Sequence, residues 1–228
     1  MYRYETHLHT SVSSACSRFT PEEVIEKYVR LGYAGVFVTD HYLRGNSSVP
    51  KDLPYEERVA RYFDGYRAVK KCAKGSGLDV FCGVEITYIG TDFLFYGLEE
   101  KWYRDNPDIM TESPKDLLLR ARNAGALIFQ AHPYRQKDYI PHIRLFPGEV
   151  EGLEIINTTE NERSNNLAKI LADAYGLRVS AGSDIHRSNQ IHLAGMEFDK
   201  KLKSEQDFVD RIRRGEGNIF TLTDEGVI

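Results

Sequence analysis

The sequence predicts an α/β protein whose strands close into a barrel. Short apolar segments alternate with segments of helical spacing along most of the 228 residues, which is typical of strand–helix units around a mostly parallel sheet. About seven such units fit one closed barrel of this length, and an open doubly wound sheet is the alternative. No Gly/Ser-rich linker, tandem repeat or low-complexity tract divides the chain, so we expect a single domain over residues 1–228.

The first strand and the first helix are clearly marked. Residues 2–8 are predicted as a strand and residues 20–32 as a helix. Thr20 is the expected N-cap, Pro21 suits the first helical position, and Glu23 completes a capping box.

The same alternation continues to the C-terminus. Further strands, marked by β-branched and aromatic residues, are predicted at residues 35–41, 78–88, 91–98, 126–132, 152–158, 178–186 and 218–223. Further helices, marked by apolar residues at helical spacing, are predicted at residues 53–74, 113–125, 161–176 and 204–215. Residues 193–228 follow the last candidate motif, so we expect their helix and strand to close the domain.

Composition and charge limit the functions of the chain. With 41% hydrophobic and 28% charged residues it is ordinary for a soluble globular protein, and its net charge of −4 argues against coating nucleic acid. Cys16, Cys72 and Cys82 form no CxxC pair, which suggests a reducing compartment. There is no apolar signal-peptide region and no apolar run of membrane-spanning length. We therefore expect a cytoplasmic protein with no membrane partner.

Metal-ligating residue types recur at the predicted strand ends. His7 and His9 alternate on the first strand and therefore face the same side. Asp184 and His186 repeat this spacing late in the chain. Because catalytic groups of parallel barrels gather at the carboxyl ends of the strands, we expect these side chains to converge. The candidate ligands are His7, His9, His41, Glu85, His132, Asp184 and His186.

A single histidine near a strand end is usually an ordinary core or surface residue. Chance nevertheless explains poorly why five of the seven histidines, with Glu85 and Asp184, fall at one predicted barrel mouth. His142 and His192 lack this context and are interpreted as ordinary loop residues.

The ligand types and their number indicate the metals. Imidazole and carboxylate together suit Zn, Mn or Fe. The candidates outnumber the ligands of a closed tetrahedral zinc site, so the sequence predicts two or three divalent ions with a bridging carboxylate. Two ions about 3.5–4 Å apart can clamp the attacking and leaving oxygens of a phosphate ester.

Short motifs around these residues carry a resemblance to a known family. In order along the chain they are "HLHT", "VTDH", "GVE", "AHP" and "GSDIH". This ordered set resembles the PHP (polymerase and histidinol phosphatase) family from the N-terminus to about residue 192. The resemblance implies a distorted (β/α)7 TIM-like barrel whose usual activity is metal-dependent hydrolysis of phosphate esters.

The resemblance also implies how the ligands divide. His7, His9, Glu85 and Asp184 would hold one metal ion, and Glu85 would bridge to a second ion that is shared with His132. His41 and His186 would hold a third ion.

The chain departs from the family pattern after the first motif. Many relatives carry a further histidine there that binds the third ion, whereas Ser14 and Ala15 occupy those places here. Cys16 is the nearest suitable ligand, and a small buried thiol is the alternative interpretation.

A second departure follows Glu85. Many relatives have a histidine in a "HVVGL"-like string, and Leu94 replaces it in "LFYGL". Water or substrate is expected to complete the second site. Asp92 could substitute, although this is not the preferred interpretation.

Several polar residues near the motifs are candidates for supporting roles. Arg135 in "AHPYR" and Arg18 beyond the first motif could bind phosphate, because a guanidinium matches its oxygens, or could be solvated surface charges. Asp40, directly before His41, is expected to orient a ligand. Asn157 occupies a polar position common in the family and could contact substrate or belong to a helix N-cap region.

The expected reaction is attack on phosphorus by a metal-bound hydroxide. Such water is already ionised at about pH 7, so no dedicated base is expected, and His186 or His41 could protonate the leaving oxygen. The expected partner is a small phosphorylated substrate. Nucleic acid is expected only as a possible substrate and not as a bound partner. The alternatives are an amidohydrolase-like hydrolase of amides or lactones, and a non-catalytic metal-binding domain.

Overall fold

The computed structural model describes residues 1–225, so residues 226–228 of the predicted closing segment lie outside the described residues. The strands are β1 (Tyr2–Leu8), β2 (Gly35–Val38), β3 (Asp79–Tyr88), β4 (Thr91–Tyr96), β5 (Leu127–Ala131), β6 (Gly152–Asn157), β7 (Arg178–Gly182), β8 (His192–Phe198) and β9 (Asn218–Thr223). The helices are α1 (Pro21–Arg30), α2 (Tyr55–Tyr62), α3 (Asp64–Cys72), α4 (Glu100–Asp105), the 3-10 helix η1 (Pro107–Met110), α5 (Pro114–Asn123), α6 (Glu162–Tyr175) and α7 (Glu205–Arg213).

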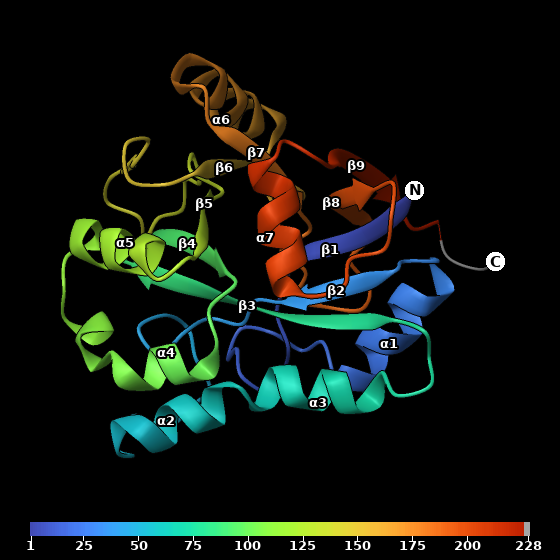
Figure 1. The fold of residues 1–228 in the computed structure, drawn as a ribbon, viewed down its shortest axis with the longest axis horizontal. Coiled ribbons are helices and arrows are strands. Elements are labelled where there is room, and N and C mark those ends of the chain that lie inside the picture. The colour runs from blue at the N-terminus through green and yellow to red at the C-terminus, as the bar shows by residue number, and fades with distance from the viewer. Residues whose placement is uncertain (226–228) are drawn as a thin grey trace.

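The strands form one sheet that curls into a nearly closed, distorted barrel (Figure 1). Among the described residues the strand order is β7-β6-β5-β4-β3-β2-β1-β8-β9. A bridge between Leu8 and Ile185 joins the chain at the ends of β1 and β7, and the His9 amide donates to the Ile185 carbonyl at 3.0 Å. The predicted α/β barrel is therefore confirmed, and the open doubly wound alternative is wrong.

The sheet is less parallel than the sequence predicts. β1, β2 and β3 run parallel to one another, as do β5, β6 and β7. β4 lies antiparallel between β3 and β5, because Ile89 and Gly90 both have positive φ and form a tight hairpin turn. β8 and β9 are also antiparallel to their neighbours. Regular strand–helix alternation therefore holds for only part of the barrel.

The strand β8 is absent from the predicted elements. Its sequence "HLAGMEF" contains a glycine, which weakens the strand signal. Gly195 is needed here because a Cβ would meet the Tyr4 carbonyl oxygen at 2.1 Å, so β8 lies close against β1. The interpretation of His192 as a loop residue is wrong, since it is the first residue of β8, although its side chain is exposed.

The predicted helix at residues 53–74 is two helices, α2 and α3. Ser13 lies at the junction, where its hydroxyl donates to the Tyr62 carbonyl at 2.7 Å and accepts from the Gly65 amide at 3.0 Å. A contact from a distant loop thus replaces the continuous helical hydrogen bonding that local spacing predicts. In α1, by contrast, the capping box of Thr20 and Glu23 is present as predicted.

The helix α7 packs into one end of the barrel. The ring centroid of Phe208 lies 4.5 Å from that of Phe37 and 5.1 Å from that of Tyr96, and all three rings are buried. Tyr96 is the last residue of β4, whereas β4 begins at the other end. The carboxyl ends of β1, β2 and β3 therefore face the end that α7 leaves free.

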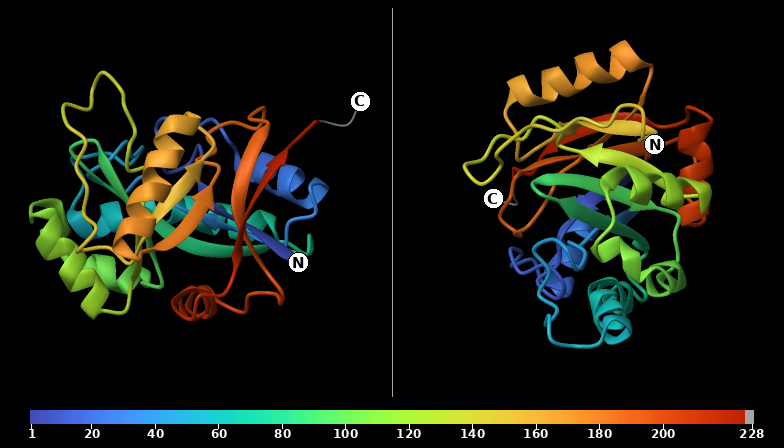
Figure 2. Two further views of the ribbon diagram at one scale, coloured as in Figure 1. Left: turned by 90° about the horizontal axis from the view of Figure 1, so that it is seen from above. Right: turned by 90° about the vertical axis from the view of Figure 1, so that its left-hand side faces the viewer.

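The remaining helices lie outside the sheet. In both Figure 1 and Figure 2, α2 and α3 run along one side of the molecule and α6 lies on the opposite side. None of the helices in residues 1–225 is both long enough and apolar enough to cross a membrane.

Candidate metal centre

His7 and His9 lie together where β1 ends. Their Nε2 atoms are 3.1 Å apart, and both side chains are buried. Gly182, at the end of β7, permits this position because a Cβ there would approach the His7 Cβ to 2.4 Å. The alternation of the strand thus directs both imidazoles into the barrel mouth, as predicted.

The carboxylate of Glu85 lies between four histidines. Its Oε1 is 3.3 Å from the Nε2 atoms of His7 and His132. Its Oε2 is 3.4 Å from Nε2 of His9 and 2.6 Å from Nδ1 of His41. The two oxygens therefore face different pairs of histidines.

The two oxygens of Asp184 have different kinds of partner. Its Oδ1 lies 3.2 Å from Nε2 of His9 and 3.5 Å from Nε2 of His7. Its Oδ2 accepts hydrogen bonds from Arg135 at 2.5 Å and from the Thr159 hydroxyl at 3.2 Å. One oxygen thus faces the histidines, and the other is held by the surrounding chain.

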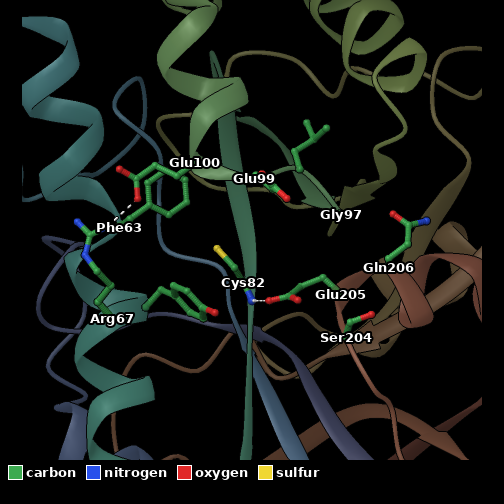
Figure 3. A pocket seen from close by; sticks show the side chains of 11 residues that line it. Phe63, Arg67, Cys82, Gly97, Glu99, Glu100, Ser204, Glu205 and Gln206 are labelled. Carbon is green, nitrogen blue, oxygen red and sulfur yellow. Dashed lines mark hydrogen bonds and ion pairs between the residues drawn. The ribbon is translucent and has the colours of Figure 1, made fainter.

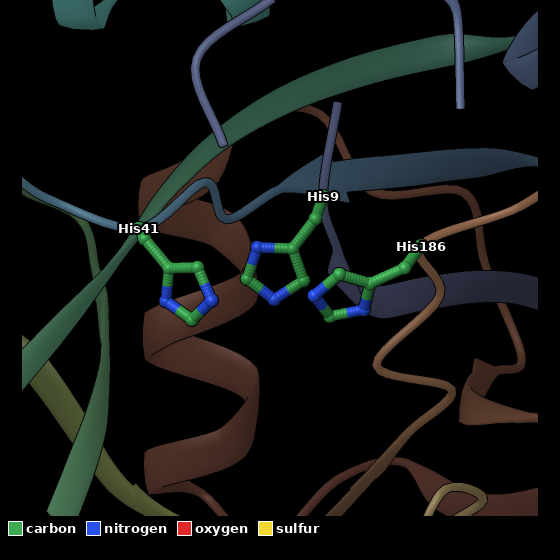
Figure 4. Close-up of side chains that lie close together, drawn as sticks. All are labelled: His9, His41 and His186. Atoms are coloured by element: carbon green, nitrogen blue, oxygen red, sulfur yellow. The ribbon is translucent and has the colours of Figure 1, made fainter. Parts of the chain in front are cut away.

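Three histidines form a second part of the cluster. Figure 4 shows the rings of His9, His41 and His186 side by side, with the ring centroid of His9 4.4 Å from that of His41 and 4.3 Å from that of His186. Cys16 lines the same cavity as His41 and His186. Burial raises the pKa of the Cys16 thiol, but the interactions with His186 and His41 outweigh burial and lower it to about 6.

The ligand atoms fall into three groups, each within 4.8 Å. The groups are His7, His9 and Asp184; His7, Glu85 and His132; and His9, His41 and His186. His7 and His9 each belong to two groups, so the groups are contiguous. The structure thus brings together all seven predicted ligands.

Some polar atoms of this cluster have no hydrogen-bond partner among the described residues. His41 Nδ1 and Glu85 Oε2 are 2.6 Å apart, yet their geometry is not that of a hydrogen bond, and both atoms are buried. Unsatisfied buried polar atoms are rare in folded proteins. Their lone pairs, together with the neighbouring donor set, fit a bound cation.

The carboxylates of the cluster are held in their ionised form. Burial raises the pKa of the Glu85 carboxyl, but the charges of His41 and His7 lower it well below its usual value. For Asp184 the charges of His7 and Arg135 likewise outweigh burial and lower the pKa. Ionised carboxylates supply the negative charge that a group of cations requires.

Sequence reasoning missed Glu154. This buried carboxylate, in the middle of β6, lies with its Oε1 2.8 Å from Nδ1 of His7, and its Oε2 accepts from the His132 amide at 3.0 Å. Burial alone would lower the pKa of His7, but the charge of Glu154, with those of two further carboxylates, raises it. Glu154 therefore fixes the ring of one ligand and the backbone of another. A lone acidic residue in an otherwise apolar strand was the available signal.

The second departure from the family pattern has a structural explanation. Leu94 lies opposite Glu85 in the β3–β4 pair and is buried in the apolar core. Asp92, two residues nearer the mouth, has its Oδ2 3.8 Å from Nε2 of His132. Its other oxygen, Oδ1, is buried without a hydrogen-bond partner in residues 1–225. Burial, followed by the charge of Glu85, raises the pKa of this carboxyl.

Asp40 contacts the cluster through Ser14. Its Oδ1 accepts from the Ser14 hydroxyl at 2.6 Å, and the same hydroxyl oxygen lies 3.2 Å from Nδ1 of His9. The Ser14 oxygen also accepts from the His41 amide at 3.0 Å. The orienting role predicted for Asp40 would therefore act through Ser14. The sequence analysis considered Ser14 only as a position at which a family ligand is missing.

The residues expected to bind substrate lie at different depths. Arg135 lines the mouth, but its Nε donates to Glu160 at 2.6 Å in addition to its bond with the cluster. Arg18 is exposed and donates to backbone carbonyls of its own loop. Asn157 is fully buried, and its Nδ2 donates to Glu154 at 2.9 Å. Their roles in substrate binding remain predictions.

The backbone is left-handed at two ligand positions. His132, directly after β5, has a φ of 29°, and Asp184, shortly after β7, has a φ of 50°. Residues other than glycine rarely adopt positive φ, and where they do the strain is often associated with a functional site. Here the turn follows each strand end and directs the side chain into the mouth.

A cavity of about 430 Å³ opens on the cluster. Its lining includes Cys16, His41, Asp92, Arg135 and His186. A larger cavity of about 490 Å³ lies elsewhere, beside α3, α7 and the end of β4, and Figure 3 shows Cys82 and Glu205 in its wall. No histidine lines that cavity among the described residues, so access to the cluster is through the smaller one.

The fold and the side chains at its mouth define an α/β barrel that gathers histidines and carboxylates for metal ions. The PHP domain profile matches residues 5–134, and a PHP-associated profile matches residues 162–216. The chain belongs to the PHP domain family, which confirms the resemblance carried by its motifs.

Solved structures show the same fold. A two-domain protein from Bacteroides vulgatus ATCC 8482, described as containing a predicted PHP-like metal-dependent phosphoesterase, aligns with a TM-score of 0.72 and 17% identity over 96% of this chain. The present chain spans 64% of the length of that protein. PsfC from Pseudomonas syringae PB-5123 aligns with a TM-score of 0.63 and 13% identity over 98% of this chain and 92% of its own.

An amidohydrolase from Chromobacterium violaceum, solved with bound sulfate and no metal, aligns with a TM-score of 0.53 and 15% identity over 80% of this chain and 87% of its own. Identities this low show a shared fold and do not transfer a substrate. A search among curated proteins gave no significant match.

Proposed function

We propose that the protein is a metal-dependent phosphoesterase that hydrolyses a phosphate ester at two or three divalent ions, Zn, Mn or Fe. The observation that carries the proposal is the position of Glu85. One of its oxygens lies 3.3 Å from His132 and the other 3.4 Å from His9, which suits a carboxylate bridge between two ions. Two ions about 3.5–4 Å apart can stabilise both the attacking and the leaving oxygen of the ester.

The ligand groups support a division of the first two ions. His7, His9 and Asp184 would hold the first ion together with one oxygen of Glu85. His132 would hold the second ion with the other oxygen. The pairwise distances of 3.1–3.5 Å support this assignment, with Oε2 of Glu85 facing His9 and Oε1 facing His132.

Asp92 would complete the second site in place of the histidine that many relatives have at Leu94. Its buried oxygen without a hydrogen-bond partner supports this role, as does its distance of 3.8 Å from His132. Leu94 itself is buried among apolar side chains and offers no ligand atom.

Cys16 would join His41 and His186 at the third ion. Its position in the cavity wall with both rings supports this role, and the interactions with these rings lower the thiol pKa to about 6. A thiolate is a good ligand for zinc, and a nearby metal ion deprotonates a thiol further. Cys16 would then compensate for the absence of a ligand at Ser14 and Ala15.

When bound, the divalent ions would neutralise the phosphoryl oxygens and ionise the attacking water. Side chains of the protein orient the ligands of these ions. Arg135 and Asn157 both donate to Oδ2 of Asp184, which keeps Oδ1 directed at the histidines. His186 lines the cavity and would protonate the leaving oxygen when two ions are bound, whereas with three ions it would serve as a ligand, as would His41.

We propose that the substrate is a small phosphorylated compound. If the protein acts on nucleic acid at all, nucleic acid would be a substrate and not a binding partner. Hydrolysis of an amide or lactone is the second candidate, favoured by the likeness of the fold to the amidohydrolase. The convergence of all seven candidate ligands argues against a non-catalytic metal-binding domain. None of the three cysteines is paired, which supports the expected reducing compartment, the cytoplasm.

The test is to strip the purified protein with a chelator and to reload it separately with Zn, Mn and Fe(II). We expect at least two ions per chain by elemental analysis, together with hydrolysis of members of a panel of phosphate esters. One ion or none at saturation would contradict the polynuclear site. Turnover of amides or lactones, with no phosphate ester cleaved, would instead support the second candidate.

A further inference from the structure

Two arginines line the cavity above the ligand cluster, and they differ in whether the guanidinium is paired with a carboxylate. Arg44 and Arg135 both line it. Arg135 forms ion pairs with Glu160 at 2.6 Å and with Asp184 at 2.5 Å, so its charge is neutralised. In the described part of the chain, the guanidinium of Arg44 contacts backbone carbonyls and an aromatic ring but no carboxylate.

The guanidinium of Arg44 is nevertheless held in place. Its Nη1 donates to the carbonyls of Ile109 at 2.8 Å and Glu112 at 3.2 Å, and its carbon lies 5.0 Å from the ring centroid of Tyr88. These contacts leave Nε and Nη2 without a partner in residues 1–225. Adjacent guanidinium donors bind two oxygens of a carboxylate or phosphate side by side, so Arg44 presents a fixed anion-binding edge.

Arg44 lines the cavity beside the end of β3. Tyr88, over which it stacks, follows Glu85 by three residues on β3. A strand rises about 3.3 Å per residue, so this separation is about 10 Å. This is the backbone separation of Glu85 and Tyr88, and the Arg44 guanidinium contacts Tyr88, Ile109 and Glu112 rather than a candidate metal ligand. On this geometry the guanidinium would face a part of the substrate other than the phosphoryl group held at the ligands.

We propose that Arg44 determines specificity by binding a second anionic group, carboxylate or phosphate, on the leaving-group side of the ester. The inference rests on the proposed phosphoesterase function, because the metal centre must fix the scissile phosphate. The cavity volume of about 430 Å³ suits a small bound molecule. An ordered, half-buried guanidinium without a carboxylate partner favours an anion over a neutral or cationic group.

The test uses ω-phosphonoalkanoates of increasing chain length, each paired with its carboxamide. The two members of a pair differ in charge but hardly in shape, and neither can be hydrolysed as an ester. Calorimetry on the zinc-loaded protein gives the ratio of their dissociation constants. For at least one chain length we expect the carboxylate to bind roughly 10–100-fold more tightly, as for a charged hydrogen-bonded pair.

The variant Arg44→Met should reduce this ratio to about one and leave binding of the carboxamides nearly unchanged. Because Arg44 also holds two backbone carbonyls, Arg44→Lys serves as a second variant, and we expect it to retain part of the preference through its charge. The control is Arg61→Met, which removes an exposed arginine that pairs with Glu57 on α2, and should retain the full ratio.

A ratio near one at every chain length in the unmodified protein would overturn the inference, as would a ratio that Arg44→Met leaves unchanged. If no phosphonate bound at all, the inference would fall with the metal centre on which it rests. Failure of the proposed function itself gives a different result. Phosphate esters would then not be hydrolysed, whereas the phosphonate ratios report on Arg44 without any turnover.

Discussion

Arg135 and Asp184 form an ion pair at the edge of the ligand cluster. Nη2 of Arg135 donates to Oδ2 of Asp184 at 2.5 Å, while Oδ1 of the same carboxylate lies 3.2 Å from Nε2 of His9. Groups that bind the outer oxygen of a ligating carboxylate orient its inner oxygen. The arginine that the sequence predicts as a phosphate ligand therefore orients the carboxylate of Asp184, a candidate metal ligand.

The substitution Arg135→Met should weaken binding of the first metal ion. We expect a loss of roughly 10–100-fold in affinity, because Asp184 would lose the donor that fixes it. Titration with zinc against a competing chelator measures the change, and Arg61→Met is the matched control on an exposed helix. Unchanged metal affinity with a raised KM for phosphate esters would instead support the role predicted from the sequence.

Glu85→Gln and Asp184→Asn should each lower turnover by more than about a hundredfold and release at least one metal ion. Both changes preserve volume but remove charge from ligand positions, so far-ultraviolet circular dichroism should remain unchanged. His142→Ala, at an exposed loop position, should keep most of the activity. Equal losses at His142 and Asp184 would show that the ligand assignment has no discriminating value.

Cys16→Ser should lower the occupancy of one metal ion and leave the others in place. A hydroxyl is a much weaker zinc ligand than a thiolate, and Cys16 is the cysteine that lines the cavity together with His41 and His186. Elemental analysis at limiting zinc measures the loss. Cys72→Ser, on the outer helix α3, is the control. Full occupancy in Cys16→Ser would identify the thiol as a packing residue.

Asp92→Asn should weaken the second ion selectively. The amide keeps the volume of the side chain but loses the negative charge of a carboxylate whose Oδ2 lies 3.8 Å from Nε2 of His132 and whose Oδ1 has no hydrogen-bond partner in residues 1–225. Metal content after dialysis at graded zinc concentrations should show an ion lost earlier than in the unmodified protein. The control, Asp138→Asn, alters an exposed residue of the loop after β5, and an equal effect of both changes would argue against a ligand role.

Stability should decline at alkaline pH because buried tyrosines resist ionisation. Burial raises the pKa of Tyr4 from 10.0 to about 12, and burial raises that of Tyr28 well above its usual value. The unfolded chain loses these protons at lower pH than the folded chain. The stabilisation is thus complete below the unfolded pKa and is lost as pH rises through the folded one.

Urea unfolding of the metal-free protein at about pH 8–12 would measure this loss. Tyr4→Phe should make the decline shallower. It should also lower stability at neutral pH, because the Tyr4 hydroxyl accepts from the Leu202 amide at 2.7 Å. A decline of the same steepness in Tyr4→Phe would exclude Tyr4 as a contributor.

Local signals in the sequence were sufficient to predict that the seven candidate ligands lie together. Alternation on a strand places residues i and i+2 on one side, which is why the common direction of His7 and His9 was predicted from spacing alone. The capping box at Thr20 is equally local and is present as predicted. The supporting carboxylate Glu154 was missed, since its partners His7 and His132 lie far away in the chain.

The sequence by itself determined the α/β class, the strand ends and the residue types that gather there, because these depend on spacing between near neighbours. Only the tertiary structure decided the pairing of β8 with β1 and the break between α2 and α3 at Ser13. It also decided that Arg135 pairs with carboxylates, whereas Arg44 contacts none among the described residues. Each of these depends on hydrogen bonds or ion pairs between residues distant in the chain. Such partners come together only when the barrel closes, so local spacing contains no signal for them.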